Sequence, residues 1–132
     1  MGAQICYESL FPAFSRSLAQ LGAEFIVNVT NDSWYGSWQE PYQHMYMTLA
    51  RGIEFRRPVL RVTNTGISTV SLASGEILKQ SPIHKPWADI YQVPYLKNPP
   101  VTFYQSWFWL VPGLLWSSLV ILLIIGFKKQ RH

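Results

Sequence analysis

The sequence is poor in charge and nearly free of cysteine. Charged residues make up 14% of the 132 residues, against roughly 25% in soluble domains. Hydrophobic residues reach 48% and aromatic residues 15%, so part of the chain is expected outside water. The net charge of +4 comes from scattered residues. Without a basic stripe, nucleic acid is not expected as a partner.

A single cysteine, Cys6, excludes an internal disulfide and a multi-thiolate metal site. No other metal-ligand spacing is present, so neither a metal nor a cofactor is expected. The start of the chain lacks the basic and apolar regions of a signal peptide. It begins almost inside a strand, and we therefore expect an upstream portion to belong to it.

The first half of the chain alternates short apolar runs with helical patterns. Residues 3–5 form an apolar approach to Cys6, and residues 10–21 have apolar residues at helical spacing, with Gly22 as a stop. The expected apolar face of this helix consists of Leu10, Phe11, Phe14, Leu18 and Leu21.

A second strand and a second helix follow. Residues 25–30 are rich in β-branched side chains, which predicts a buried strand. Residues 31–38 form a polar loop containing aromatic side chains, and residues 42–55 predict an amphipathic helix that ends before Pro58. The expected buried face of this helix consists of Tyr42, Met45, Tyr46, Leu49, Ala50 and Ile53.

Beyond Pro58 the pattern predicts a hairpin. Residues 59–63 and 67–72 are the two strands, with a turn at 64–66. From 77 to 100 the signal is weaker: there are five prolines and one plausible strand at 90–93. Residues 1–100 are taken as one partial domain of α/β class.

The C-terminal segment predicts one membrane-spanning helix. Residues 101–127 carry no charge, and 107–127 is long enough to cross a hydrocarbon core about 30 Å thick. Residues 101–106 are expected to be a juxtamembrane linker. The basic tail at 128–132 predicts a cytoplasmic C-terminus, which puts the globular part in the periplasm of a bacterium. A buried core helix is the competing interpretation.

Cys6 is the candidate nucleophile, because a strand that ends on a reactive residue before a helix presents that residue at a sharp bend. A buried cysteine acting as a small hydrophobe is the alternative. Among the histidines, His132 lies in the tail and His84 in a proline-rich loop, while His44 is a candidate for binding. Glu8 is a poor base, because its charge disfavours a nearby thiolate.

Five motifs stand out along the chain: Gln4-Ile5-Cys6-Tyr7-Glu8, Asn31-Asp32-Ser33-Trp34-Tyr35-Gly36, Gln43-His44, Arg57-Pro58, and Arg61-Val62-Thr63-Asn64-Thr65-Gly66. Together they resemble the carbon–nitrogen hydrolase (nitrilase) superfamily, and most closely its apolipoprotein N-acyltransferase branch. The resemblance covers nearly the whole chain but only the last part of the family's length. It implies the C-terminal portion of a nitrilase-like four-layer αββα sandwich, followed by one transmembrane helix.

The resemblance also implies a chemistry. The nucleophile would be Cys6, the backbone N–H of Tyr7 would donate to the oxyanion, and Glu8 would be a supporting carboxylate. The Glu and Lys of the family's triad would lie upstream. The implied reaction moves an acyl chain from a phospholipid, through a cysteine thioester, to the N-terminal amine of a diacylglyceryl-cysteine apolipoprotein at the bacterial inner membrane. Trp34, Tyr35 and His44 are the expected substrate contacts.

Two other interpretations remain open at this stage. The chain could be a membrane-tethered amidase half that acts on small amides, or an inactive truncated membrane protein. Arg51, Glu54 and Arg57 are expected to form structural ion pairs rather than to bind substrate.

Overall fold

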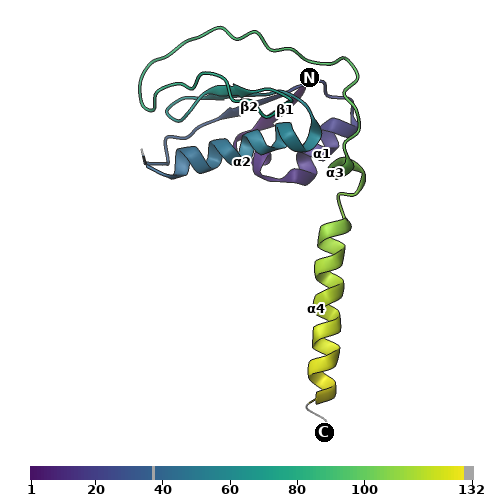
Figure 1. The fold of residues 1–132 in the computed structure, drawn as a ribbon. Coiled ribbons are helices and arrows are strands. Elements are labelled where there is room, and N and C mark those ends of the chain that lie inside the picture. Colours follow the sequence, from purple (N-terminus) through teal and green to yellow (C-terminus); the bar gives the residue numbers. More distant parts are fainter. Residues whose placement is uncertain (37, 130–132) are drawn as a thin grey trace. The chain divides into compact units, whose positions relative to one another are not determined.

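The computed structural model of the chain describes residues 1–36 and 38–129, with side chains described as far as Phe127. The chain divides into two compact units, Met1–Thr102 and Phe103–His132, and each is treated separately below. Figure 1 shows the chain coloured along its sequence. The expected tail at 128–132 lies outside the described side chains.

The first unit is built on a four-stranded sheet in the order β1-β2-β3-β4. Strands β1 (Gly2–Ile5), β2 (Ile26–Thr30) and β3 (Val59–Thr63) are parallel, and β4 (Thr69–Ser71) pairs antiparallel with β3. The expected hairpin is therefore present. The strand expected at 90–93 is wrong: this segment is coil, and Ile90 is 93% exposed with no neighbouring strand to pair with.

The helix expected at 10–21 is divided in two. A 3-10 helix, η1 (Cys6–Leu10), precedes α1 (Pro12–Gln20). The break falls at Phe11, which is extended with φ −94° and ψ 105°. A residue before proline is pushed out of the helical region by the proline ring, so Pro12 begins a new helix and separates Leu10 from it.

The apolar face expected for residues 10–21 is partly wrong, because only Leu10 and Leu18 of its five members are half-buried. The buried side chains of α1 are Ser15 and Ala19, whereas Phe14 is 37% exposed and the flanking Phe11 and Leu21 are 64% and 85% exposed. The physical reason is a polar contact: Gln4 Nε2 on β1 donates to Ser15 Oγ at 2.6 Å. This bond turns Ser15 toward the sheet, and the aromatic side chains therefore face outward.

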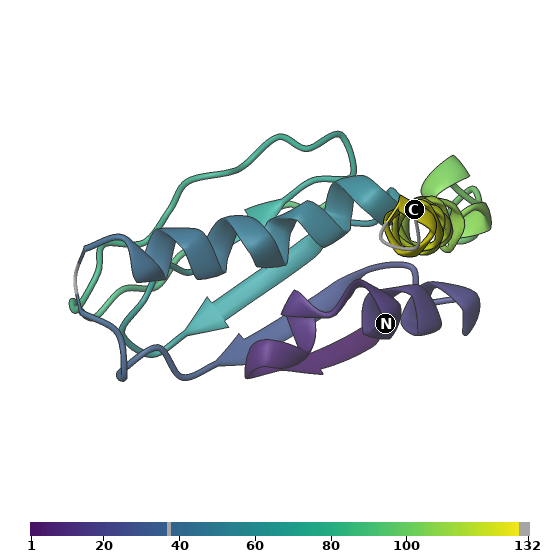
Figure 2. The ribbon, with the colours of Figure 1, turned by 90° about the horizontal axis from the view of Figure 1, so that it is seen from below.

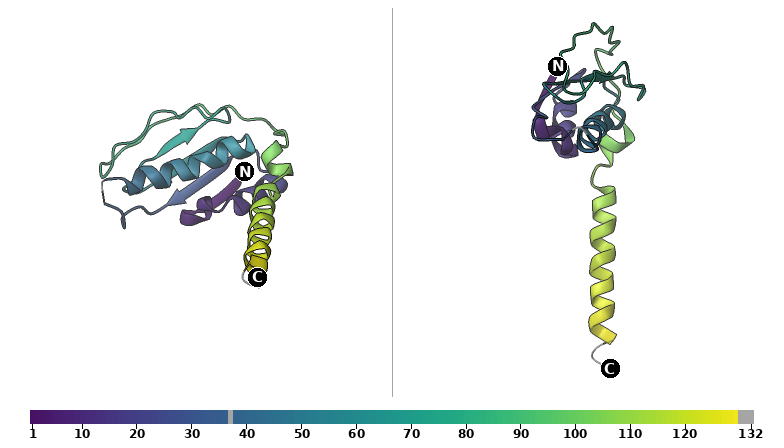
Figure 3. Two further views of the ribbon diagram at one scale, coloured as in Figure 1. Left: turned by 60° about the horizontal axis from the view of Figure 1, so that its bottom comes forward. Right: turned by 90° about the vertical axis from the view of Figure 1, so that its left-hand side faces the viewer.

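Helix α2 (Glu40–Phe55) runs along one face of the sheet, against β3 (Figures 2 and 3). Met45 and Leu49 are buried as expected, but Tyr42, Tyr46 and Ile53 are 43%, 56% and 51% exposed. The expected face is thus partly wrong. The buried face instead includes three polar or charged residues, His44, Thr48 and Arg51, together with Gly52 and Phe55.

The core lies between α2 and the sheet and consists of Ile26, Met45, Leu49, Val59 and Ile67. The opposite face of the sheet carries alternate strand residues, and among them Ile5, Val29 and Val62 are 69%, 55% and 52% exposed. Figure 1 shows α1 and α2 on one side of the sheet and the long coil after β4 on the other. The sheet therefore has one packed face and one largely open apolar face.

The charged residues on and near α2 divide by role. Arg51 and Glu54 form an ion pair at 2.8 Å, as expected. Arg57 does not pair with an acid. It is buried and donates to the backbone carbonyls of Ala23, Phe55 and Ala19 at 2.5, 2.5 and 3.2 Å.

The second unit holds α3 (Phe103–Ser106) and α4 (Leu110–Lys129). Residues 107–109 form a turn, so the long helix begins three residues after the expected position. Within the described residues, Leu110–Phe127 is the one helix long and apolar enough to cross a membrane by length and composition, with a mean hydropathy of 2.4. Pro112 falls in its first turn, where a missing N–H is tolerated.

Candidate active site

The segments that follow the three parallel strands all begin at one edge of the sheet. Strand β1 leads directly into Cys6, β2 into the loop that begins at Asn31, and β3 into the turn that begins at Asn64. Because the carboxyl ends of parallel strands meet at the same edge, this is where ligands bind in open α/β sheets. The residues of three separate sequence motifs are thereby brought together.

Cys6 occupies a strained position at this edge. Its backbone has φ +50°, in the left-handed region, and its side chain is half-buried with a free thiol. A non-glycine residue in that region costs free energy, of order 1–3 kcal/mol, and such residues cluster at functional sites. The bend expected from the sequence is therefore present. The thiol is half-buried, whereas a cysteine that only fills the core as a small hydrophobe would be fully buried.

Two donors hold the carbonyl oxygen of Cys6. Asn28 Nδ2 donates to it at 3.2 Å and Ser9 Oγ at 3.1 Å. Glu8 accepts a hydrogen bond from the backbone N–H of Ile5, at 2.7 Å from Oε2. The Glu8 carboxylate is thus tied to the residue that precedes the cysteine, and this position supports the turn.

Three of the expected site residues form one ring cluster. Tyr7 stacks on His44 with ring centroids 5.3 Å apart, and Tyr35 approaches His44 edge-on at 5.7 Å. The hydroxyl of Tyr35 donates to that of Tyr7. Trp34 is 83% exposed and lies outside this cluster. The structure therefore brings Tyr7, Tyr35 and His44 together, beside Cys6, and leaves Trp34 on the surface.

A buried ionic network lies beneath this ring cluster, and its importance was missed in the sequence. Asp32 Oδ2 accepts from Arg61 Nη2 at 2.7 Å, and Asp32 Oδ1 lies 3.0 Å from His44 Nδ1. Asp32 and Arg61 are each only 1% exposed. One signal was available: Arg61 stands at an inward position of the otherwise apolar strand β3. Buried charges are rare unless they are paired.

The network determines the charge state of its carboxylate. Burial alone raises the pKa of Asp32, but the hydrogen bond from His44 and the charge of Arg61 outweigh it. The pKa of Asp32 therefore lies below its usual value of 3.8. Burial raises the pKa of Tyr35, and its hydrogen bond with Tyr7 adds to the rise. Asp32 is accordingly an anion and Tyr35 a neutral phenol at neutral pH.

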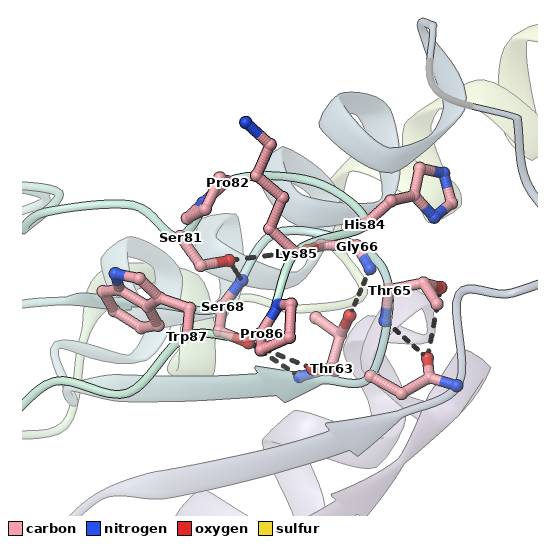
Figure 4. A pocket seen from close by; sticks show the side chains of 11 residues that line it. Thr63, Thr65, Gly66, Ser68, Ser81, Pro82, His84, Lys85, Pro86 and Trp87 are labelled. Carbon is pink, nitrogen blue, oxygen red and sulfur yellow. Dashed lines mark hydrogen bonds between the residues drawn. The ribbon is translucent and has the colours of Figure 1, made fainter.

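A pocket of about 490 Å³ lies beside the turn after β3 (Figure 4). Three of its hydroxyl groups are already engaged with the backbone. Thr63 Oγ1 accepts from the N–H of Gly66 at 2.7 Å, Ser68 Oγ from that of Thr63 at 3.0 Å, and Ser81 Oγ from that of Ser68 at 2.8 Å. These bonds hold the turn together, so the candidate active site is placed at Cys6 and not in this pocket.

No group of three His, Cys, Asp or Glu side chains within residues 1–36 and 38–127 is placed to hold a metal ion. The chemistry that the site offers by itself is nucleophilic, with one thiol in a strained turn and backbone N–H groups next to it.

Comparison with known proteins agrees with this architecture. The family model described as carbon–nitrogen hydrolase matches residues 1–95. A solved carbon–nitrogen hydrolase from Helicobacter pylori superposes with a TM-score of 0.53 at 16% identity, over 64% of this chain and 36% of that one. An amidase from Nesterenkonia superposes with a TM-score of 0.51 at 20% identity, over 61% of this chain and 33% of that one.

Curated relatives are more similar in sequence. The apolipoprotein N-acyltransferase of Bdellovibrio bacteriovorus is 54% identical over 125 residues, which is 95% of this chain and 22% of the relative. The enzyme of the same name from Pasteurella multocida is 36% identical over 134 residues, or 96% of this chain and 24% of the relative. The chain thus spans less than a quarter of the length of these relatives.

The mixed β-sheet, the family model and the superposed structures together define the class: a nitrilase-like α/β fold, present here in part. The chain belongs to the carbon–nitrogen hydrolase family, which is a family of enzymes. The resemblance to apolipoprotein N-acyltransferases drawn from its motifs is confirmed.

Proposed function

We propose that this chain is the cysteine-bearing part of an apolipoprotein N-acyltransferase, which moves an acyl chain from a phospholipid to a lipoprotein amine. The observation that carries the proposal is Cys6 itself, half-buried at φ +50° on the carboxyl edge of the sheet. The 54% identity to the Bdellovibrio enzyme supports the acyl-transfer chemistry over other reactions of the family.

The proposed reaction has two halves. The thiolate of Cys6 attacks the ester carbonyl carbon of a phospholipid, and the carbonyl π electrons move onto oxygen. When the carbonyl re-forms, the lysophospholipid leaves with its electron pair and takes up a proton. The α-amine of a diacylglyceryl-cysteine then attacks the thioester, loses a proton and releases the thiol. The backbone N–H of Tyr7 donates to the oxyanion in both halves.

Exposed aromatic side chains favour lipid substrates over small amides. Trp34 and Trp38 are 83% and 84% exposed, and Tyr42 and Tyr46 continue the aromatic surface along α2. A pocket of about 460 Å³ is lined by Trp38, Gln39, Tyr42, Gln43 and Tyr46. Amphipathic rings of this kind bind where one side is apolar and the other wet. Tyr35 and His44 line a further pocket of about 160 Å³ beside Tyr7. We therefore assign Trp34, Tyr35 and His44 to the substrate side of the site.

The apolar helix α4 fits a membrane-bound enzyme. It would hold the site at the bilayer surface, where phospholipid and lipoprotein are both embedded. In a bacterium this is the inner membrane, with the globular part in the periplasm and the C-terminus in the cytoplasm, according to the positive-inside rule. The Glu and Lys that complete the triad in the family are proposed to come from chain beyond these residues.

The test reconstitutes the full chain with the remaining part of the Bdellovibrio relative in detergent. Phospholipid-dependent acylation of a diacylglyceryl lipopeptide is measured beside hydrolysis of small amides. Acylation of the lipopeptide with a hydroxylamine-sensitive intermediate on Cys6 is expected, and Cys6→Ser is expected to abolish the intermediate. Amide hydrolysis without lipopeptide acylation would identify the amidase alternative. No Cys6 intermediate with either substrate would leave the inactive membrane protein.

A further inference from the structure

One peptide group connects the buried network to the reactive cysteine. The carbonyl of Cys6 and the N–H of Tyr7 belong to the same peptide unit. Asn28 Nδ2 and Ser9 Oγ hold the carbonyl at 3.2 and 3.1 Å. Both donors are fully buried, at 0% exposure. Because the two groups point in opposite directions across a planar trans peptide, a carbonyl that points into the interior turns the Tyr7 N–H away from it.

Both donors lead back to one guanidinium. Arg61 Nη1 donates to Asn28 Oδ1 at 2.9 Å and to Thr48 Oγ1 at 3.1 Å. Thr48 Oγ1 lies 2.8 Å from Ser9 Oγ. Two chains of hydrogen bonds therefore run from Arg61 and meet at the carbonyl oxygen of Cys6.

We propose that Arg61 is a positioning residue, which fixes the Cys6–Tyr7 peptide through Asn28 and Ser9 so that the Tyr7 N–H faces the oxyanion. Arg61 touches neither substrate nor thiol in this role. The inference rests on the proposed acyl-transfer function, because only a reaction that develops an oxyanion uses this N–H.

Asn28 is the firmer of the two connections. An arginine only donates hydrogen bonds, so its contact with Asn28 must be to the amide oxygen. That contact leaves the amide NH₂ group directed at the Cys6 carbonyl. The hydroxyl connection is looser: Ser9 and Thr48 have two protons for three contacts, since Thr48 Oγ1 also lies 2.9 Å from the carbonyl oxygen of His44. Loss of the Asn28 connection is therefore expected to cost more.

The other arm of the guanidinium anchors it. Arg61 Nη2 binds Asp32 at 2.7 Å, and Asp32 in turn contacts His44 on α2. The planar fork of arginine serves Asn28, Thr48 and Asp32 from two nitrogens, whereas the single ammonium of lysine cannot match this geometry. Lysine at position 61 therefore keeps the charge but loses the fixed directions.

Two reagents separate orientation of the peptide from reactivity of the thiol. A p-nitrophenyl ester acylates Cys6 through a tetrahedral oxyanion and releases p-nitrophenolate, which is counted by absorbance. Iodoacetamide alkylates the same sulfur by direct displacement of iodide, with no oxyanion. Because Cys6 is the sole cysteine of the chain, both rates report on one atom. Cys6→Ser supplies the background, and the ratio of the two rates is the readout.

The critical comparison is Arg61→Lys with Arg57→Lys, both in the chain reconstituted in detergent with the remaining part of the Bdellovibrio relative, after subtraction of the Cys6→Ser rates measured in the same way. Each substitution removes a buried guanidinium, but Arg57 binds only the backbone carbonyls of other segments. We expect Arg61→Lys to lower the acylation-to-alkylation ratio about 10- to 100-fold. This is less than the loss expected when an oxyanion donor is removed completely, because Arg61→Lys only misorients the Tyr7 N–H. Arg57→Lys is expected to leave the ratio within about twofold of the original chain.

Two milder substitutions keep the proposal testable if Arg61→Lys does not fold. Asn28→Asp retains the oxygen that Arg61 binds but removes the donor to Cys6, and Ser9→Ala removes the hydroxyl. Both are expected to lower the ratio, Asn28→Asp more strongly. The control is Ser17→Ala, which removes a hydroxyl bound to the carbonyl of Ala13 on α1.

Each outcome has one meaning. Unchanged ratios in Arg61→Lys, Asn28→Asp and Ser9→Ala overturn the positioning role. Equal losses of acylation and alkylation overturn it too, because they indicate a general structural effect. If the ratio falls as expected but the reconstituted protein transfers no phospholipid acyl chain, the proposed function fails and the positioning role stands.

Discussion

At the scale of single residues, the site is defined by charges that the fold has removed from water. Asp32, His44 and Arg61 are at most 4% exposed and contact one another at 2.7 to 3.2 Å. A buried ion pair contributes little against a well-packed apolar pair, but breaking one partner leaves an uncompensated charge. These residues therefore act as a unit, and their effects are not expected to add.

The first prediction concerns Asp32→Asn. We expect a loss of about 3–5 kcal/mol in the free energy of unfolding at neutral pH, because Arg61 remains buried without its counter-ion. Urea denaturation followed by circular dichroism measures it, with the chain reconstituted in detergent with the remaining part of the Bdellovibrio relative; the other stability measurements use the same sample. The matched control is Asp89→Asn, whose partner Lys79 is exposed. A similar loss in both variants would contradict the special status of the buried pair.

The pH dependence of stability follows from the same carboxylate. The pKa of Asp32 is lower in the folded chain than its usual value of 3.8, so its contribution is complete above about pH 4–5 and is lost as the pH falls through the folded pKa. The original chain should lose stability steeply below about pH 4. Asp32→Asn should lose less unfolding free energy than the original chain when the pH is lowered. An equal loss at low pH in both proteins would exclude Asp32 as its source.

Gly66 allows Asp32 to take its position. A Cβ atom added at Gly66 would lie 2.8 Å from Asp32 Cγ, closer than carbon atoms pack. We expect Gly66→Ala to destabilise the chain by about 1–3 kcal/mol through overpacking. Gly36→Ala is the control, because nothing lies within 4 Å of the added atom. Equal thermal midpoints for the two variants would contradict this close approach.

At the scale of elements, polar contacts decide which face a helix buries. The spacing in α2 groups Met45 and Tyr46 together on one apolar face. In the structure Met45 is fully buried at 0% exposure and Tyr46 is 56% exposed. The helix is turned so that His44 and Thr48 reach Asp32 and Arg61 on the sheet.

This orientation predicts opposite effects for neighbouring positions. Met45→Ala should cost about 2–5 kcal/mol because it opens a cavity in the core. Tyr46→Ala should change the free energy of unfolding by no more than about 0.5 kcal/mol. Denaturant midpoints with unchanged slopes measure both. Comparable losses at the two positions would show that the helix packs with the face expected from spacing alone.

At the scale of the whole molecule, the globular unit presents an apolar sheet face that nothing within it fully covers. Ile5, Val29 and Val62 lie on this face and are each more than half exposed. Exposed apolar patches of this kind mark surfaces that bind other protein. In a four-layer sandwich the second sheet would pack here, which agrees with a chain that spans less than a quarter of its relatives' length.

The open face predicts the behaviour of the chain on its own. It should bind a hydrophobic dye such as ANS and melt without a sharp cooperative transition in detergent. The remaining part of the Bdellovibrio relative should lower dye binding and sharpen the transition. Val29→Thr with Val62→Thr should weaken that rescue, whereas Val59→Thr, in the core, should destabilise the chain with or without it. A sharp transition in the chain alone would contradict this prediction.

Much of the secondary structure followed from the sequence. β-Branched runs predicted β2 and β3, and helical spacing with Gly22 as a stop predicted most of α1. These signals are local, because strand and helix preferences depend on neighbouring residues. The strand predicted at 90–93 is absent, because strand formation also depends on a partner that is not local in sequence. A short apolar run becomes a strand only beside a partner, and this segment has none.

By itself, the sequence determined the order of elements, the cysteine at the end of β1, the family resemblance and the one long apolar helix. Only the tertiary structure revealed that Asp32, His44 and Arg61 form one network and that this network reaches the peptide after Cys6. Contacts between residues 12 to 39 positions apart make these links. No periodicity within one segment records such pairings, because the fold creates them when it brings the strand ends to a common edge.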